Sequence, residues 1–180
     1  FEANAYLFDL EELEEMLALV PAEFKDNAGI VKLQKKAEGL KKTSKGKMFT
    51  DIKGKNQDGK EVALSDYAGK GKVVLIDFWA SWCPYCISDM PFLVDAYAKY
   101  KEKCFEIVGV TLDDDVEAWK SGIEKTKITW PQMSDLKGWE SELSTAYAVS
   151  GLPHVVLIDK DGTIIDRGFG GKELDAKLAE

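Results

Sequence analysis

The sequence predicts an α/β fold with a central mixed sheet, preceded by a lead-in β-hairpin and an N-terminal helical extension. Three observations carry this prediction. Residues 73–79, VVLIDFW, form a nearly continuous apolar segment, as expected of a strand buried on both faces. Strand-like and helix-like segments alternate from 73 to 126, which predicts parallel strands joined by right-handed crossovers. A predicted antiparallel hairpin and a closing helix follow over 154–179.

Length and composition limit the possible functions. With 180 residues, 45% of them hydrophobic, the chain can bury one main core and carry an appendage. The formal net charge of -8 argues against nucleic acid or anionic lipid as a partner, because surfaces that bind these concentrate Lys and Arg. No run of about 18 apolar residues occurs, so no transmembrane segment is predicted. Since the chain begins with Phe1 rather than Met, we expect it to start inside a longer product, whose signal or anchor lies outside this sequence.

Two amphipathic helices are predicted at the N-terminus. The first spans 9–20, with Asp9 as its N-cap, and the second spans about 23–42. Apolar residues recur at helical spacing in both: Leu10, Leu13, Leu17 and Val20, then Ile30, Leu33, Ala37 and Leu40. We therefore expect a helical extension over 1–45, joining an upstream region to a domain over 46–180. Packing of the apolar stripe on that domain is its simpler role, and partner binding is the alternative.

The elements of the main domain are predicted in order. Segments 49–52 and 61–64 flank the turn signal Asp58-Gly59 and predict a short hairpin. The remaining elements are strands at 73–79, 105–111, 154–159 and 163–168, and helices at 84–101, 115–126, 139–148 and 172–179. This order predicts a parallel half-sheet joined to an antiparallel hairpin.

Two cysteines, Cys83 and Cys86, lie in the segment WASWCPYC and could form a zinc site, a structural disulfide or a redox pair. A structural zinc site needs four ligands, and only Cys104 and His154 remain to complete one. A Cys83–Cys86 bond closes too short a loop to stabilise the fold much through chain entropy. Reversible thiol-disulfide exchange is therefore the favoured chemistry, and no metal is predicted.

A family resemblance supports this choice. It rests on the run VVLIDFWASWCPYC, on Pro91 after the second cysteine, and on Gly151-Leu152-Pro153 before a predicted strand. These segments resemble the thioredoxin superfamily. The lead-in hairpin, the tryptophans on either side of Ala80-Ser81 and the helix at 115–126 further resemble the exported TlpA/ResA-like thiol-disulfide oxidoreductases of bacteria. The missing P-x-x-x-T-x-x-C pattern argues against a peroxiredoxin.

The resemblance covers 46–180 and implies a thioredoxin-like fold with substrate-binding residues around the cysteines. Trp82, Pro84, Tyr85, Leu152 and Pro153 are implied to contact the substrate, with Pro153 as a cis-proline. Leu152 would offer its backbone groups to an extended substrate strand. It also implies an exported protein, periplasmic or membrane-anchored and facing the periplasm.

The two cysteines are predicted to have different roles. Cys83 follows a strand and precedes a helix, where Pro84 suits the first helical position. Unpaired amides and the helix dipole there favour a thiolate, so Cys83 is predicted to be the exposed nucleophile. Cys86, one turn further, is predicted to be shielded and to resolve the mixed disulfide.

Two carboxylates are candidates for accepting the proton of Cys86. Asp77 lies inside the apolar strand on the face of Leu75 and Trp79, where burial would raise its pKa toward a value useful for a general base. A hydrogen-bonded core Asp without a kinetic role is the alternative. Asp89, three residues past Cys86, is a second candidate, but complementing the helix dipole explains it nearly as well.

Three further features receive structural interpretations. His154 is predicted to be a strand residue with a satisfied ring rather than a group that tunes the site. Cys104, just before an apolar strand, is predicted to be a buried, inert thiol. The run Asp113-Asp114-Asp115 is predicted to cap a helix rather than bind calcium, because no Gly-containing ligand loop follows it.

The leading functional hypothesis is an enzyme that exchanges disulfides with protein substrates, as a reductant, through the Cys83–Cys86 couple. No cofactor beyond this redox-active disulfide is predicted, since nothing in the sequence matches an NADPH or flavin site. Electrons would then come from a membrane or exported donor, as the resemblance implies. A disulfide oxidase or isomerase is the alternative within redox chemistry, and a binding module for thiol-bearing partners is the alternative from another class.

Overall fold

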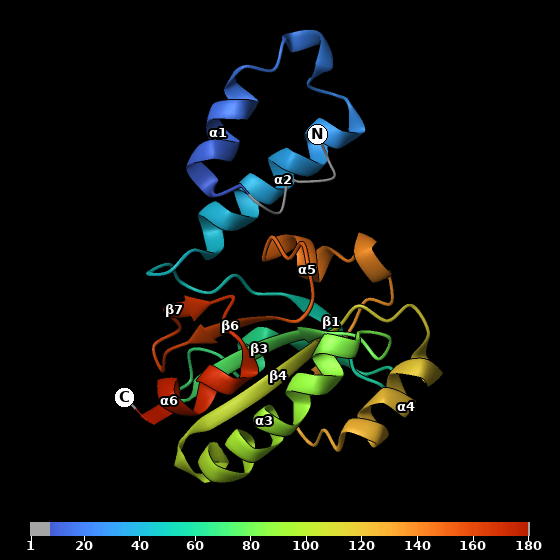
Figure 1. Cartoon of the computed structure of the whole chain (residues 1–180), viewed down its shortest axis with the longest axis vertical. Helices are drawn as coiled ribbons and strands as arrows, with labels where there is room; N and C mark the ends of the chain where they lie inside the picture. Colours follow the sequence, from blue (N-terminus) through green and yellow to red (C-terminus); the bar gives the residue numbers. More distant parts are fainter. Residues whose placement is uncertain (1–7, 180) are drawn as a thin grey trace.

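The computed structural model describes residues 8–179, and its core is a five-stranded mixed sheet (Figure 1). The strand order is β5-β4-β3-β6-β7, with β3 in the centre. The bounds are Val73–Trp79 (β3), Phe105–Thr111 (β4), Gln132–Met133 (β5), His154–Ile158 (β6) and Ile164–Arg167 (β7). Strand β3 runs parallel to β4 and antiparallel to β6, and β7 pairs antiparallel with β6. The predicted parallel half-sheet joined to an antiparallel hairpin is confirmed.

Helices cover both faces of this sheet (Figure 1). On one face α3 (Pro84–Tyr100) packs against α6 (Leu174–Ala179) and α4 (Val116–Thr126). On the other lies α5 (Glu142–Ala146), and Tyr147 at its end contacts the ring of Phe78 in β3, with centroids 5.7 Å apart. Because both faces are covered, β3 is buried almost throughout, as its apolar sequence predicts.

The lead-in hairpin is present, but its first strand is shifted from the predicted position. Strand β1 spans Lys53–Lys55 rather than 49–52, and β2 spans Glu61–Ala63. The Asn56 side chain accepts hydrogen bonds from the backbone of Asp58 and Lys60, which closes a tight turn. The strand pairing therefore begins directly beside this turn, with Lys55 opposite Glu61. Residues 49–52 instead attach the hairpin to the core, since Thr50 exchanges two hydrogen bonds with the Tyr147 hydroxyl.

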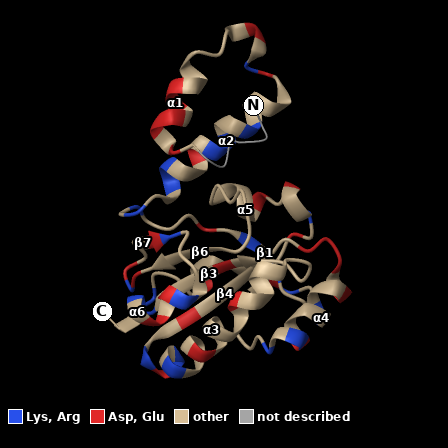
Figure 2. Ribbon diagram, viewed as in Figure 1, with Lys and Arg blue, Asp and Glu red and all other residues tan. Residues whose placement is uncertain are grey.

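The N-terminal extension consists of two packed helices. Helix α1 (Leu10–Ala18) begins with a capping box between Asp9 and Glu12, as the sequence predicts. Helix α2 (Ala28–Thr43) begins later than predicted, because Asn27 provides the N-cap. The apolar stripes of the two helices meet in a cluster of Leu13, Leu33 and Ala37. Figure 2 shows acidic residues along α1 and basic residues along α2, and Lys41 of α2 pairs with Glu14 of α1 at 3.0 Å.

The C-terminal half of α2 packs on the sheet domain. A Cβ atom on Gly39 would lie only 2.9 Å from the carbonyl oxygen of Thr145, so this glycine permits close contact with α5. At the end of α2, the Arg167 guanidinium donates to the carbonyl and hydroxyl oxygens of Thr43, at 2.9 and 2.8 Å. The same group donates to the carbonyl of Tyr147 and contacts Nε2 of His154 at 3.0 Å. The extension is therefore joined to β6 and β7 through one half-buried cation.

His154 has the satisfied ring that the sequence predicts. Burial, together with the neighbouring Arg167 charge, lowers the pKa of His154 to about 4. At neutral pH the imidazole is uncharged, so Nε2 can accept the hydrogen bond from Arg167.

Three smaller elements differ from the predictions. Strand β5 is absent from the predicted set, since two residues give too short a pattern to recognise. Helix α5 spans Glu142–Ala146 rather than 139–148, because Gly138–Glu140 forms a separate 3₁₀ turn and Ser141 caps the helix. A 3₁₀ turn at Gly171–Glu173 precedes α6. Between residues 8 and 179, no helix is long and apolar enough to cross a membrane.

Candidate active site

The two cysteines lie where β3 delivers the chain to α3. Cys83 is the N-cap of α3 and is disulfide-bonded to Cys86, with Pro84 at the first helical position. The Cys83 sulfur also accepts a hydrogen bond from the Cys86 amide at 3.2 Å. Unpaired amides at a helix N-terminus stabilise negative charge. The geometry therefore favours a thiolate at Cys83 once the bond is reduced.

Cys83 is less accessible than the sequence predicts. Its exposed fraction is 4%, and that of Cys86 is 1%, so the predicted exposure of Cys83 is wrong for the oxidised protein. As an N-cap, the Cys83 side chain folds back over the first turn of α3, and its sulfur faces the helix amides rather than solvent. The predicted shielding of Cys86 is confirmed.

Asp77 is a buried carboxylate in the central strand. It is 1% exposed, and its Oδ2 atom has no hydrogen-bond partner within the described chain. Burial raises the pKa of Asp77 to about 7, and the negative charge of Asp89 adds to the effect. Asp77 lies two residues before Trp79, so both side chains are on the same face of the sheet, the face on which the Trp79 ring meets Gly122 of α4. A carboxyl group that titrates near neutral pH can both accept and return a proton under working conditions.

Asp89 is committed in part to holding the fold. Its Oδ2 accepts a hydrogen bond of 3.0 Å from the backbone of Gly171, in the 3₁₀ turn before α6. A Cβ atom on Gly171 would lie 3.3 Å from the Asp89 carboxylate, so the turn packs closely on α3. Asp89 therefore anchors this turn and acts electrostatically on Asp77.

A third carboxylate, Asp113, positions the loop that carries Cys83, and sequence reasoning missed it. It is 1% exposed and accepts from the Ser81 hydroxyl at 2.6 Å, the Ser81 amide at 3.0 Å and the Thr111 hydroxyl at 2.5 Å. Helix α4 packs closely on Ser81, because a Cβ atom added to Gly122 would lie 2.7 Å from the Cβ atom of Ser81. Within the predicted capping run, Asp115 does cap α4, while Asp113 joins the ends of β3 and β4.

Three predicted substrate-binding residues, Trp82, Pro84 and Tyr85, adjoin the cysteines in the chain, and Leu152 and Pro153 lie just before β6. Trp82 and Tyr85 are 52% and 75% exposed, and the Leu152–Pro153 peptide bond is cis. A residue that sequence reasoning missed lies beside them. The Trp139 ring is 50% exposed, with its centroid 6.2 Å from that of Trp82. We call Trp82, Tyr85 and Trp139 the aromatic platform. The available signal for Trp139 was a Trp directly after Gly138, at the start of the helix predicted at 139–148.

The structure also corrects the prediction for Cys104, which is exposed rather than buried. It occupies a left-handed position (φ 62°) that ends a 3₁₀ turn before β4. In this turn the side chain points away from the core that the following strand enters.

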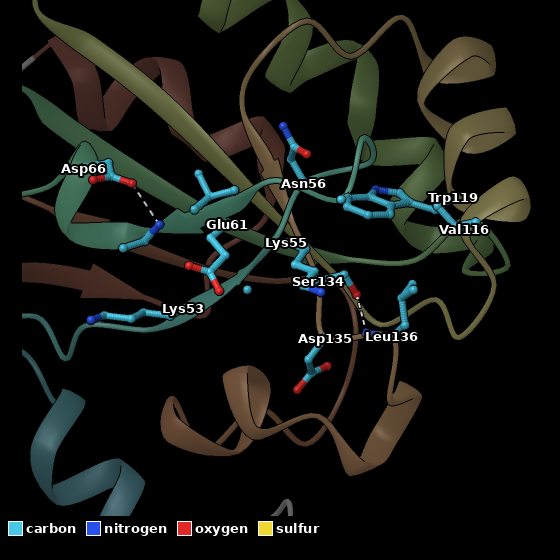
Figure 3. A pocket seen from close by; sticks show the side chains of 14 residues that line it. Lys53, Lys55, Asn56, Glu61, Asp66, Val116, Trp119, Ser134, Asp135 and Leu136 are labelled. Atoms are coloured by element: carbon cyan, nitrogen blue, oxygen red, sulfur yellow. Dashed lines mark hydrogen bonds between the residues drawn. The ribbon is translucent and has the colours of Figure 1, made fainter.

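A separate cleft lies away from the cysteines. Its volume is about 770 Å³, and Figure 3 shows it between the lead-in hairpin, the start of α4 and residues 134–136. Charges of both signs line it, including Lys53, Lys55 and Glu61. None of the residues discussed above as a redox or substrate group contributes to it. No cluster of three or more metal-ligating side chains occurs in the part of the chain that is described, residues 8–179.

Comparison with known proteins agrees with this site. The sequence model of a family described as the AhpC/TSA family matches residues 45–167. The chain belongs to the AhpC/TSA family. A relative that it resembles is the thiol-disulfide oxidoreductase ResA of Bacillus thuringiensis subsp. konkukian (strain 97-27), 36% identical over 123 residues, which cover 68% of each chain.

Solved structures give the same result. The thioredoxin domain of a thiol-disulfide oxidoreductase from Bacteroides vulgatus is 34% identical, with a TM-score of 0.69 over 76% of this chain and 96% of that domain. The C-terminal domain of a thiol-disulfide oxidoreductase from Bacteroides thetaiotaomicron is 32% identical, with a TM-score of 0.71 over 77% of this chain and 95% of that one. This AhpC/TSA family member is therefore a thiol-disulfide oxidoreductase with a thioredoxin-like fold.

Replacing Asp77 by Asn should stabilise the fold at neutral and alkaline pH but not in acid. A carboxylate whose folded pKa is raised to about 7 penalises the folded state once the pH exceeds its unfolded value of about 4. The penalty grows until the pH passes 7 and then stays constant, at about 4 kcal/mol for a shift of roughly three units. Denaturant unfolding at pH 8 and pH 3 measures the difference. An equal effect of Asp77→Asn at both pH values would contradict the raised pKa.

Replacing Asp113 by Asn should destabilise the protein by about 1–3 kcal/mol. The amide NH₂ would face one of the three donors that the carboxylate now satisfies, from Ser81 and Thr111. Thermal unfolding measures the loss. The control is Asp114→Asn, at an exposed neighbour, which should change stability by less than about 0.5 kcal/mol. Equal effects of the two variants would show that the Asp113 contacts contribute little.

Proposed function

We propose that this protein reduces disulfide bonds in exported protein substrates, with Cys83 as the nucleophile and Cys86 as the resolving thiol. The observation that carries the proposal is the cysteine pair at the N-terminus of α3 together with a buried carboxyl group, Asp77, whose pKa is raised to about 7. The first feature favours a reactive thiolate, and the second offers a proton acceptor to a thiol shielded from water.

The reaction proceeds in two exchanges. The Cys83 thiolate attacks a substrate disulfide, forms a mixed disulfide and releases one substrate sulfur as a thiolate, which takes up a proton. Cys86 then gives its proton to Asp77, and its thiolate attacks Cys83. The Cys83–Cys86 bond forms, the mixed disulfide breaks, and the second substrate thiol leaves. The substrate gains two electrons and two protons, and the dithiol becomes a disulfide.

The charges near the couple favour the reducing direction. Asp77 lies in β3, the strand that leads to Cys83, and Asp89 lies in α3, one turn after Cys86. Negative charge near a dithiol disfavours its thiolate form. A less stable thiolate makes the reduced couple a better electron donor, since strongly oxidising couples are those whose reduced form is stabilised. The helix N-terminus acts in the opposite sense at Cys83, so the measured potential will report the balance.

The surface around the couple suits a polypeptide substrate. The aromatic platform offers three exposed rings, and large aromatic side chains dominate the energetics of many protein interfaces. Trp139 also lines a groove of about 450 Å³ between α2 and α5. A second groove, of about 530 Å³, runs beside Leu152 and Pro153 and is bordered by Leu40 of α2. The helical extension would thereby help to form the substrate surface.

The proposed electron path needs no group beyond the Cys83–Cys86 couple. Each turnover leaves this couple oxidised, so a thiol donor must restore it, and we propose a membrane or exported protein for this role. The proposed location is outside the cytoplasm, periplasmic or membrane-anchored, because protein disulfides persist in oxidising compartments.

Two measurements test this proposal. Turnover of a disulfide-bonded protein with dithiothreitol as the donor separates an enzyme from a binding module, which would not turn over. The reduction potential of the Cys83–Cys86 couple then gives the direction. A value near that of thioredoxin, about -270 mV, supports a reductant, whereas a value near -120 mV would identify an oxidase and overturn the proposal.

Replacing Cys86 by Ser should trap mixed disulfides through Cys83. Without the resolving thiol, the first exchange stops after substrate attachment. Cys83→Ser is the control and should trap no substrate. Because Cys104 is exposed, both variants should also carry Cys104→Ser, which removes a competing thiol. Non-reducing gels and peptide mapping identify the bond, and equal trapping in the two variants would contradict the order of attack.

Replacing Trp139 by Ala should weaken the binding of protein substrates selectively. We expect KM to rise about tenfold, as for a modest interface hot spot, for a disulfide-bonded peptide with Phe and Leu beside its cysteines, with kcat largely unchanged. Reduction of hydroxyethyl disulfide, which is too small to reach the platform, should not change.

The matched control for Trp139→Ala is Phe24→Ala, which removes a ring of similar exposure (55% against 50%) from the N-terminal extension. It should leave both substrates unaffected. An unchanged KM for the peptide in Trp139→Ala would remove Trp139 from the substrate surface.

A further inference from the structure

Asp77 lies in a row of three residues that crosses the sheet on one level. It is opposite Gly109 of β4, and Gly109 is opposite Gln132 of β5. In parallel strands, residues in register direct their side chains to the same face of the sheet. Gly109 has no side chain, so the space between the Asp77 and Gln132 side chains is open to whichever of them extends into it.

Gln132 fills this space. An added Cβ atom on Gly109 would lie 2.1 Å from Nε2 of Gln132, so the amide group lies directly over the glycine, toward β3. Its orientation is fixed by Trp79, whose indole Nε1 donates to Oε1 of Gln132 at 3.0 Å. An indole N–H can only donate, so the atom that it contacts must be the amide oxygen. The NH₂ group is therefore the end left for another partner.

Two buried atoms of complementary type remain without partners in this row. Nε2 of Gln132 is a donor, and the residue is 3% exposed. Oδ2 of Asp77 is an acceptor. Adjacent strands are separated by about 4.8 Å, so an amide above Gly109 lies within the reach of a direct or singly bridged hydrogen bond to the Asp77 carboxyl group. Buried polar groups are normally paired, which makes these two natural partners.

We propose that Gln132 is a positioning residue for proton transfer: its Nε2 group donates a hydrogen bond to the ionised carboxylate of Asp77, directly or through one water molecule. This inference rests on the proposed function, in which Asp77 accepts the proton of Cys86. The donor stabilises the carboxylate that takes the proton and aims its other lone pairs at α3. Without such a donor, the ionised carboxylate would carry the full free-energy cost of burying a charge.

The other groups around Asp77 do not supply this stabilisation. From α3, Asp89 contributes a negative charge, which opposes ionisation of Asp77, and Cys83 and Cys86 lie at the start of the same helix. From the neighbouring strands, the residues opposite Asp77 are Gly109 and Val155, which carry no charge. Gln132 is thus the donor that the sheet directs at Asp77.

The test is the titration of Asp77 in the intact, oxidised protein, followed through the NMR shift of its carboxyl carbon. A hydrogen bond to the charged form lowers a carboxyl pKa, so its loss should raise the titration midpoint by about one pH unit or more. Gln132→Met removes the donor without adding a charge. The Asp77 midpoint should rise in this variant, and the pH profile of mixed-disulfide resolution should move in the same direction.

Gly109→Ala provides a second approach that leaves Gln132 in place. The added methyl group would displace the end of a flexible side chain, so the fold should tolerate it while the amide moves away from Asp77. Its midpoint should also rise. The matched control is Gln57→Met in the lead-in hairpin, which removes another Gln with an unpartnered buried atom and should leave the midpoint unchanged.

An unchanged Asp77 midpoint in Gln132→Met and Gly109→Ala would overturn the inference. Because the titration needs no turnover, it is read separately from activity. If the protein fails to reduce disulfides but its variants show the raised midpoints, the Gln132 contact is supported and the proposed function is rejected.

Discussion

A carboxyl group that lacks charge compensation lies in the buried central strand of the sheet, and the rest of the site is organised around it. Burying an ionisable group without a partner costs stability, so such a group persists where the surrounding packing holds it. Strand β3 is covered on both faces and continues directly into the loop that ends at Cys83. The strand that buries the Asp77 carboxyl group therefore also fixes the position of the nucleophile.

Two buried aspartates in this site show opposite uses of one side chain. Asp113 receives three hydrogen bonds from Ser81 and Thr111, so its charge is fully solvated by protein and serves to hold a loop. Asp77 has an unpartnered oxygen and a pKa raised to about 7, so it can exchange a proton. Equal burial, at 1% exposure each, therefore leads to different chemistry, and the number of donors within reach decides which.

Features encoded by neighbouring residues could be predicted from the sequence, and features encoded across the chain could not. The strand at 73–79 and the helix that starts at Pro84 follow from an apolar run and a helix-start signal. The role of Gln132 could not be predicted from its neighbours in the sequence, because it depends on a hydrogen bond from Trp79, 53 residues earlier, and on a strand of only two residues. The predicted exposure of Cys83 and the predicted burial of Cys104 were wrong for a related reason, since caps and turns, rather than the adjacent strands, set the direction of those side chains.

The guanidinium of Arg167 has a consequence for where the molecule can be divided. Family similarity begins at residue 45, yet Arg167 donates to both oxygens of Thr43, two residues before that boundary. Removing the helices at the similarity boundary would leave two hydrogen-bond donors of this half-buried cation without their acceptors, directly beside His154, the residue after the cis-proline. The structural boundary of the redox domain therefore lies before Thr43, and the last turn of α2 is part of that domain.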